Sequence, residues 1–229
     1  TSFGLLYQYT TSFLDLKENE DEYKLLGYES GIVELNSADR LTIDDLCTIM
    51  QHTKNKIETN LEDLKLIKKN IHAFYKEKGY TKFDRQKIAF IVQTVLETML
   101  CEYVQNKVPY NSHLVLSGGV FMNVKLNYML SKLVNKLSIM PLCGDQGAAI
   151  GVYHKHVANF KWPGHLYWGC RNLVPNTKFD NIDSIAQHLN QDGIANIVTG
   201  NMEFGARALC HTTTLAKPSE VEAETAMST

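Results

Sequence analysis

Apolar residues recur at helical spacing in several stretches of the chain, most clearly between residues 84 and 105. There they form one stripe along a predicted helix. The stripe consists of Ile88, Ile91, Val92, Val95, Leu96, Met99 and Tyr103. Asp84 precedes it and is a residue type favoured at helix N-caps, so we expect the helix to begin just after Asp84. Gln93 and Glu97 lie four residues apart, and we expect them to form a hydrogen-bonding pair on the helix surface.

A short apolar run at residues 114–116 predicts a buried strand that ends at a glycine corner. Ser117, Gly118 and Gly119 form this corner, and helical spacing resumes over residues 120–133. Glycine allows positive φ angles and lets a ligand approach the main chain closely. The amides at the start of the following helix lack helical partners and would face a ligand above the turn. This order of elements indicates a phosphate site, although such corners are often only tight turns.

A second corner follows a second predicted strand, at residues 136–141. Gly144, Asp145 and Gly147 belong to this corner, and a helix of small residues is expected over 148–158. The alternation of strands and helices predicts an α/β fold with partly parallel strands. Ligands in such folds bind beyond the carboxyl ends of the strands, where both corners fall.

The remaining segments are predicted to support these corners. In chain order we expect a buried helix over 1–16, a short helix opened by an acidic turn over 19–27, a strand over 31–35, a linker over 162–175, a helix over 179–189 and a strand over 194–198. The polar, lysine-rich segment 41–80 is interpreted as an insertion that contains accessory helices. The tail after residue 209 shows no pattern that could bury a surface.

Composition and charge argue against a nucleic-acid-binding, zinc-binding or membrane-spanning protein. The formal net charge of -2 gives no electrostatic reason to expect nucleic acid or an anionic membrane as a partner. The five cysteines are widely spaced without a C-x-x-C pair, which favours the reducing cytoplasm and argues against a zinc site. No apolar run reaches the length of a membrane span. Because Thr1 already lies within an apolar pattern, we interpret the chain as a piece of a longer protein.

Several polar side chains in and beyond the corners are candidates for ligand binding. Asp145 can ligate a metal or orient Mg²⁺ on a phosphate, or it can cap the following helix. Ser117 is a hydroxyl donor for a phosphate or ribose, because the G-x-S-x-G elbow of a nucleophilic serine is absent. Asn123 lies one helical turn past the corner, where its amide could meet the same ligand. Arg207 suits bidentate phosphate recognition, or it forms a structural Arg–Glu pair.

Three ordered motifs resemble the carbamoyltransferase family typified by the nodulation and antibiotic O-carbamoyltransferases. They read LVLSGGVFMNVKLN, GDQGAAIG and GNMEFGARAL, close to the family's L-x-GGV-x-x-N, GD-x-G-x-A-x-G and GRMEFGPRALGNRS. The segment with Glu22, Lys24 and Gly27 also resembles the family's E-x-K-x-x-G core, although charge runs are usually solvated turns. The helix DRQKIAFIVQTVLE fits the family's helix before its SGGV strand.

The resemblance implies a two-part enzyme. Residues 1–160 would belong to an actin-like ATPase (ASKHA) lobe of the Kae1 type, 161–180 to a linker, and 181–229 to the start of a YrdC-like domain. The enzyme would form carbamoyl adenylate from carbamoyl phosphate and ATP, and pass the carbamoyl group to a small-molecule hydroxyl acceptor. A divalent metal, iron or Mg²⁺, would take part, and a homodimer is the assembly we consider.

Matching positions imply roles for particular residues. Glu22 and Lys24 would be catalytic, and Asp145 would ligate the metal. Arg207 would belong to the second site. The nucleotide site would be lined by Ser117, Gly118, Gly119, Asn123 and Gly144. The family's metal-binding histidines lie upstream of Thr1, so the metal site would be partial. In the third motif Asn201 replaces an arginine, Ala206 a proline, and Cys210, His211 and Thr212 the family's Gly-Asn-Arg run. The loss of two arginines should weaken anion binding there. We therefore expect this polypeptide alone to be catalytically incompetent.

Two other functions fit the same residues. One is a different ATPase or sugar kinase of the ASKHA fold, because a fold does not determine a function. Kinases of that fold have no reason to contain GNMEFGARAL, which argues against this alternative. The other is a non-catalytic nucleotide-binding or assembly module, which the altered third motif favours.

Overall fold

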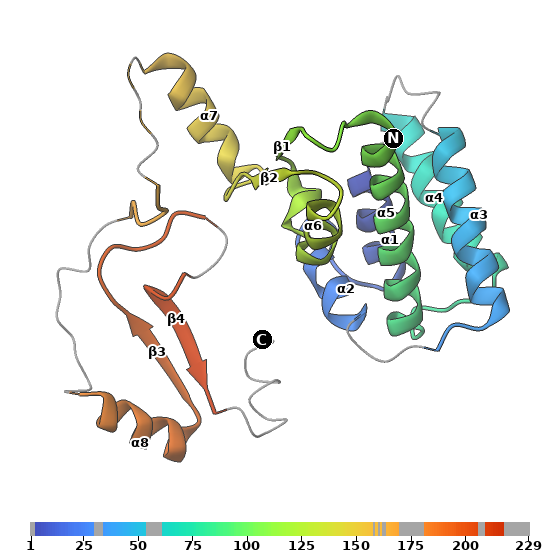
Figure 1. Ribbon diagram of the computed structural model, residues 1–229. Coiled ribbons are helices and arrows are strands. Elements are labelled where there is room, and N and C mark those ends of the chain that lie inside the picture. The colour runs from blue at the N-terminus through green and yellow to red at the C-terminus, as the bar shows by residue number, and fades with distance from the viewer. Residues whose placement is uncertain are drawn as a thin grey trace. The chain divides into compact units, whose positions relative to one another are not determined.

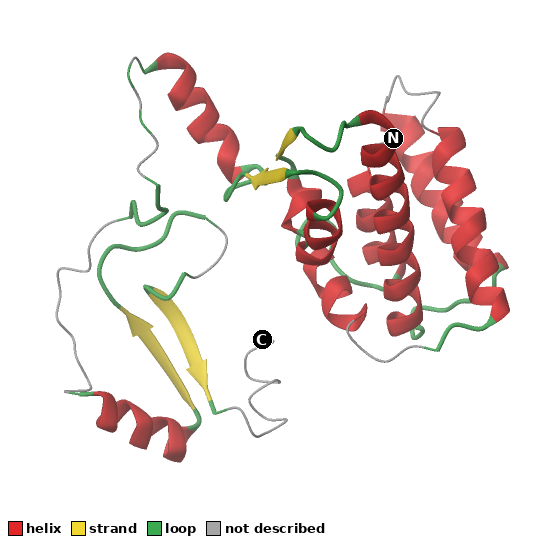
Figure 2. Cartoon of the chain, in the orientation of Figure 1, coloured by secondary structure: helices red, strands yellow, loops and turns green. Residues whose placement is uncertain are grey.

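The computed structural model describes residues 3–29, 34–53, 61–157, 159, 161, 164–169, 181–205 and 209–217. The chain divides into two compact units, Thr1–Gly147 and Ala148–Thr229. The first holds α1 (Phe3–Phe13), α2 (Glu22–Glu29), α3 (Ser37–Thr53), α4 (Leu61–Glu77), α5 (Arg85–Lys107), β1 (His113–Leu116), the 3-10 helix η1 (Gly119–Met122), α6 (Val124–Ser131) and β2 (Lys136–Ile139) (Figure 1). The second holds most of α7 (Gln146–His156), then α8 (Ile182–Asp192), β3 (Ile194–Val198) and β4 (Thr212–Ala216). The fold is mixed α/β, with two small sheets among the described residues (Figure 2).

Helix α5 is the scaffold of the first unit and contacts α1, α2, α3 and α6. Its buried apolar side chains are Ile88, Ala89, Ile91, Val92, Val95, Leu96, Met99, Leu100 and Val104. The predicted stripe is confirmed except for Tyr103, which is 45% exposed. Each large aliphatic side chain buried in this way stabilises the unit by about 1.5–3 kcal/mol relative to its exposure to water.

The start of α5 is where the sequence predicts it, but its capping differs. The helix begins at Arg85, directly after Asp84, and the Asp84 side chain makes no capping hydrogen bond. Its carboxylate instead accepts hydrogen bonds of 2.8 Å from the amide and the hydroxyl of Thr81. A short acidic side chain can bond to the turn before it as readily as to the helix after it. Asp84 therefore closes the turn that precedes α5.

The helices predicted within residues 41–80 are confirmed as α3 and α4, but both belong to the core, so their interpretation as accessory helices is wrong. Their buried side chains Ile43, Leu46, Met50, Ile71, Phe74 and Tyr75 share one hydrophobic cluster with α1 and α5. Tyr75 is fully buried, and its hydroxyl lies 3.0 Å from the hydroxyl of Thr10 in α1. The lysines on the solvated face of α4 make the segment polar on average, although its opposite face is apolar.

Strands β1 and β2 are parallel, with Leu116 opposite Ile139, and α6 lies between them in the chain. The expectation of partly parallel strands is confirmed. The strand β1 is less buried than expected, because Leu116 is buried whereas Val115 is 66% exposed. Successive side chains of a strand point to opposite faces, and only the face with Leu114 and Leu116 packs against the core. The carboxyl ends of both strands lead into the glycine corners.

In the second unit, α8 contacts β3, and β3 pairs antiparallel with β4. Reciprocal hydrogen bonds between Asn181 and Ser184 start α8, and Gly193, with φ of 80°, ends it. The predicted helix and the strand β3 are confirmed, with the helix starting later than expected. The interpretation of the whole tail as patternless is wrong, because β4 lies within it. The consecutive threonines of β4 are β-branched and suit a strand.

The predicted helices near the amino terminus are confirmed as α1 and α2. Other predictions fall on residues outside the described ranges, including 31–33 of the predicted strand 31–35 and most of the linker. The division between the two compact units falls in the first turn of α7, and the predicted domains 1–160 and 181–229 stay predictions. Among the described residues, none of the helices is both long and apolar enough to cross a bilayer.

Candidate functional site

The two glycine corners meet beyond the carboxyl ends of β1 and β2. The amide of Gly118 in the first corner donates a hydrogen bond of 2.7 Å to the carbonyl oxygen of Cys143 in the second. Ser117 directly precedes Gly118 in the first loop, and Asp145 follows Cys143 by two residues in the second. The structure therefore brings together two motifs that are separate in the sequence.

The first corner turns through one short 3-10 helix and does not lead directly into an α-helix. Gly118 has φ of 115°, a conformation that other residues rarely adopt. Helix α6 begins only at Val124, because Asn123 has an extended backbone that interrupts the helical run predicted over 120–133. The amides that face the corner therefore belong to η1 and not to an α-helix. The space beside the main chain is open, since a Cβ on Gly118 or Gly119 would meet no atom within 4 Å.

The second corner is closely packed around its glycines. A Cβ on Gly144 would lie 2.7 Å from the side chain of Gln146 and 3.0 Å from that of Met122 in η1. A Cβ on Gly147 would lie 2.0 Å from the carbonyl oxygen of Leu142. Gly147 is therefore needed for close approach of the chain to itself, whereas the flexible ends of the Gln146 and Met122 side chains could move away from a Cβ on Gly144. This packing fixes the loop that presents Asp145.

Asp145 is exposed and directly precedes α7. A carboxylate at a helix start is favoured electrostatically, so a structural role accounts for this position as well as a ligand role does. Among the described residues, no group of three or more His, Cys, Asp or Glu side chains could hold a metal ion. A single exposed carboxylate does not make an iron or Mg²⁺ site. The donor set within the described ranges therefore does not fit a complete metal centre.

Asn123 lies behind the corner and caps α6. Its Oδ1 accepts a hydrogen bond of 3.0 Å from the amide of Leu126. Its Nδ2 donates a bond of 2.7 Å to Gln93 Oε1, and its Oδ1 accepts one of 3.1 Å from Gln93 Nε2. Both ends of the Asn123 amide are thus engaged within the protein.

Gln93 and Glu97 are hydrogen bonded at 2.6 Å, but the expectation that they form a surface pair is wrong. Gln93 is 2% exposed, and its Oε1 also accepts a bond of 2.8 Å from the hydroxyl of Tyr7 in α1. The signal was present in the sequence, because Gln93 follows Ala89 by four residues and precedes Leu96 by three, on the apolar face. Burial raises the pKa of Tyr7, and the charge of Glu97 adds to this, so Tyr7 stays protonated and donates.

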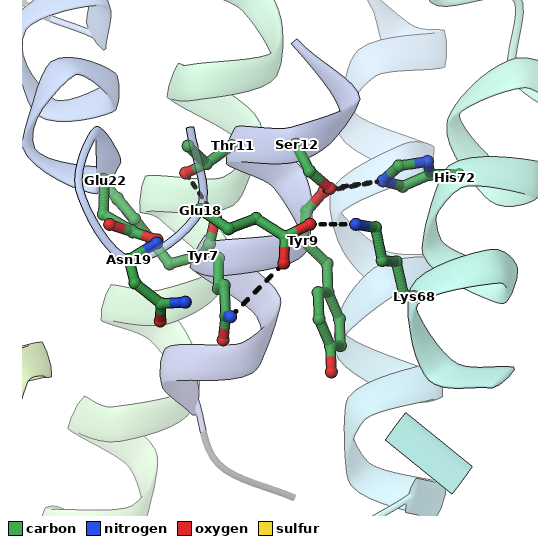
Figure 3. A network of polar contacts seen from close by, with 10 residues as sticks. Tyr7, Tyr9, Thr11, Ser12, Glu18, Asn19, Glu22, Lys68 and His72 are labelled. Carbon is green, nitrogen blue, oxygen red and sulfur yellow. Dashed lines mark hydrogen bonds and ion pairs between the residues drawn. The ribbon is translucent and has the colours of Figure 1, made fainter. Parts of the chain in front are cut away.

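Glu22 and Lys24 lie at the start of α2, after the turn that follows α1. Glu22 Oε1 accepts a hydrogen bond of 2.6 Å from the amide of Asn19 (Figure 3). Lys24 Nζ lies 3.1 Å from Asp21 Oδ1, and the hydrogen bond to Asp21 raises the pKa of Lys24. These hydrogen bonds and this ion pair stay within the turn and do not reach Ser117. The structure therefore places the predicted catalytic pair in one turn without linking it directly to the corners.

A polar network anchors this turn to α1 and α4 (Figure 3). Glu18 forms an ion pair with Lys68 of α4 and accepts a bond of 3.5 Å from Gln8 of α1. Partial burial would raise the pKa of Glu18, but hydrogen bonds from Lys68 and Ser12 outweigh it and lower the pKa. The hydroxyl of Ser12 also lies 2.9 Å from His72 Nε2. The network fixes the turn that precedes α2.

Glu203 closes a loop in the second unit, a role that the sequence did not reveal. Its Oε1 accepts hydrogen bonds from the amides of Leu209, His211 and Thr212, at 2.8, 2.6 and 3.0 Å. The Thr212 hydroxyl donates to Oε2. Desolvation would raise the pKa of Glu203, but these bonds outweigh it and hold the pKa well below its ordinary value. Arg207, predicted for an anion site or a pair with glutamate, lies outside the described residues.

Two aromatic stacks join the segment 164–169 to Phe204 of the third motif and to His211 just after it. The rings of Tyr167 and His211 stack with centroids 3.8 Å apart, and those of Trp168 and Phe204 with centroids 5.7 Å apart. The Phe204 amide also donates a bond of 2.7 Å to the carbonyl oxygen of Leu166. The segment around Glu203 is therefore folded against residues 164–169.

Comparison with known proteins gives three matching relatives and one family. The family model for the carbamoyltransferase N-terminus matches residues 1–153. An uncharacterized protein of Methanocaldococcus jannaschii is 27% identical over 97% of this chain and 47% of its own length, and a second one is 25% identical over 95% and 40%. The 3'-hydroxymethylcephem-O-carbamoyltransferase of Amycolatopsis lactamdurans is 26% identical over 57% of this chain and 28% of its own length. The chain thus spans less than half the length of each of these relatives.

Proposed function

Because this chain belongs to the carbamoyltransferase family, we propose that it is part of an O-carbamoyltransferase whose first unit binds ATP at the paired glycine corners. The whole enzyme would use carbamoyl phosphate and ATP, by way of carbamoyl adenylate, to carbamoylate the hydroxyl of a small molecule. The relative from Amycolatopsis lactamdurans, named as a cephem O-carbamoyltransferase, supports a hydroxyl acceptor.

The hydrogen bond between Gly118 and Cys143 is the observation that supports this proposal most directly. It joins an open stretch of main chain to a loop that presents a carboxylate. Phosphate oxygens accept hydrogen bonds from exposed main-chain amides where no Cβ blocks their approach. Gly119 meets this requirement, since a Cβ there would lie in open space, whereas the amide of Gly118 already donates to Cys143. The Ser117 hydroxyl would supply a further donor, and Asn123 would hold the corner from behind.

Glu22 and Lys24 are proposed to serve the transfer step. In that step the acceptor oxygen forms a bond to the carbamoyl carbon, the bond to AMP breaks, and the acceptor hydroxyl loses its proton. The Glu22 carboxylate is the group of the pair that can accept a proton. Lys24, whose pKa is raised by Asp21, stays protonated and can stabilise negative charge on the reacting group. No step is assigned to a metal, because Asp145 alone is not a metal site.

The remaining proposals concern the assembly of the whole enzyme. We place the first unit in an ASKHA-type, Kae1-like lobe, and the residues from 181 onward at the start of a YrdC-like domain. Arg207 would belong to the site of that second domain. The 229-residue chain by itself is expected to bind nucleotide without transferring a carbamoyl group. A cytoplasmic location and a homodimer are the setting we propose.

Calorimetric titration of the full chain with ATP and Mg²⁺ tests the proposal. We expect saturable binding below about 1 mM, and weaker binding for Asp145→Ala, because the Asp145 carboxylate would help to hold the Mg²⁺ that accompanies the phosphates of ATP. Asp183→Ala is the matched control, because it removes an exposed carboxylate from the first turn of α8 in the other unit. Absence of ATP binding at millimolar concentration would overturn the proposed function.

A further inference from the structure

We propose that Gln93 is a positioning residue that holds the glycine corner in shape for its ligand, acting through Asn123; the inference rests on the proposed function. Gln93 lies in the middle of α5, 30 residues before Asn123 in the sequence. It is 2% exposed, yet it is polar and makes four hydrogen bonds. A polar side chain placed so deeply in an apolar helix face is costly unless every bond is kept.

The bonds of Gln93 have only one consistent direction. An ionised carboxylate can only accept hydrogen bonds, so Glu97 fixes Nε2 of Gln93 toward itself. The Oε1 atom must then face the other way, where it accepts from the Tyr7 hydroxyl and from Asn123 Nδ2. The charge of Glu97 therefore sets the orientation of the Gln93 amide.

The same logic fixes Asn123 from the opposite side. The main-chain amide of Leu126 can only donate, so it requires Oδ1 of Asn123. This leaves Nδ2 of Asn123 for Gln93 Oε1, in agreement with the orientation that Glu97 sets. The two amides are thus locked in register from both ends, and the start of α6 is fixed to α5.

Asn123 passes this constraint on to the corner. The main-chain amide of Asn123 donates a hydrogen bond of 3.1 Å to the carbonyl oxygen of Val120. Asn127 Nδ2 donates one of 2.7 Å to the carbonyl oxygen of Phe121. Residues 117–122 are therefore held at one end by β1 and at the other by Asn123. The positive φ of Gly118 depends on such anchoring, because an unconstrained glycine can adopt many other backbone conformations.

Three variants and a stability control test this role in the full chain. Gln93→Leu removes the amide and leaves Asn123 without its partner. Gln93→Glu places a second carboxylate next to Glu97. The double variant Gln93→Glu/Glu97→Gln has one carboxylate again, now at position 93, and the amide at position 97 can donate hydrogen bonds to it. Val95→Ala is the control, because it truncates a buried side chain of the same helix outside the network.

The first readout is ATP affinity at equal thermal stability. We expect Gln93→Leu and Gln93→Glu to weaken ATP binding by about tenfold or more, and Val95→Ala to leave it within about twofold of the wild type. The double variant should recover most of the affinity lost in Gln93→Glu. If Gln93→Leu and Val95→Ala lose ATP affinity equally, Gln93 contributes only to general stability and the proposal is overturned.

The second readout does not require a nucleotide. Hydrogen exchange of the peptide over residues 117–126 should be faster in Gln93→Leu than in Val95→Ala, with equal exchange in the peptide of β4. Unchanged exchange at the corner would overturn the inference even if the chain binds ATP. If the wild type fails to bind ATP, the proposed function fails, and this exchange measurement still decides whether Gln93 shapes the corner.

Discussion

The amide nitrogen of Gly118 lies 2.7 Å from the carbonyl oxygen of Cys143, and this bond joins the loops that follow β1 and β2. The two loops contribute different properties to one place in the first unit. The loop with Gly118 and Gly119 offers open main chain, whereas the loop with Asp145 offers a negative charge at the start of α7. Their union is the basis of the proposed nucleotide site.

Replacement of Gly118 by alanine should destabilise the first unit by about 1–3 kcal/mol, because a side chain at φ of 115° is strained. Gly119→Ala is the matched change, since its added Cβ meets no atom within 4 Å and its φ is not positive. Urea unfolding followed by far-ultraviolet circular dichroism compares the two. Equal stability of both variants would contradict the backbone described for the corner.

Replacement of Gly147 by alanine should cost about 1–3 kcal/mol, because the new methyl group would overlap the carbonyl oxygen of Leu142. Gly151→Ala in α7 adds a methyl group in open space and should be neutral or stabilising by up to about 1 kcal/mol. Thermal unfolding of both variants provides the comparison. A Gly147→Ala protein as stable as the wild type would show that the second corner is not closely packed.

Truncation of Tyr75 tests whether α4 belongs to the core. Tyr75→Ala should destabilise the first unit by about 3–5 kcal/mol, because it removes a fully buried ring. Leu66→Ala on the same helix should change the stability by less than about 0.5 kcal/mol, since Leu66 is 55% exposed. Chemical denaturation measures both. Similar small effects would favour an accessory helix after all.

Much of the first unit follows from the sequence pattern, because its main signals are local. The stripe on α5, the two short strands and the glycine corner depend on residues close together in the chain. The errors arise where the mean polarity of a segment does not reveal the apolar face of a helix. The lysines of α4 make the segment polar on average, although the other face of α4 is buried and contains Tyr75. The strand β4 was missed because its threonines are polar in composition but suited to a strand in shape.

The site itself was predictable only in part. The order of motifs placed Ser117 and Asp145 near strand ends, and parallel pairing then puts both ends at one edge. The partnership of Gln93 with Asn123 joins residues 30 positions apart and depends on how α5 packs against the corner. Likewise, the carboxylate of Glu203 collects main-chain amides of a loop whose shape no local pattern indicates.

Acidification should destabilise the second unit through Glu203. Its pKa is well below the ordinary value in the folded chain, so its stabilising effect is complete above the unfolded pKa of about 4.3 and is lost progressively as the pH falls further. Both tryptophans, Trp162 and Trp168, belong to this unit, so fluorescence-detected urea unfolding reports on it.

The control for this prediction is Glu203→Gln, which cannot change its charge. The variant should be less stable than the wild type at neutral pH, because a neutral amide oxygen accepts the same bonds more weakly. Its stability should also fall less between about pH 5 and pH 3 than that of the wild type. If the stability of the two proteins falls equally with decreasing pH, the Glu203 carboxylate does not hold the loop.

ATP titration of Gly119→Ala beside Gly151→Ala is the most direct test of the central claim that the first glycine corner receives the polyphosphate. Both changes add one methyl group in open space, and only Gly119 lies where a phosphate would approach the main chain. The account predicts that Gly119→Ala binds ATP at least about tenfold more weakly than the wild type, while Gly151→Ala binds it equally well. Wild-type ATP affinity in a folded Gly119→Ala protein would contradict the account.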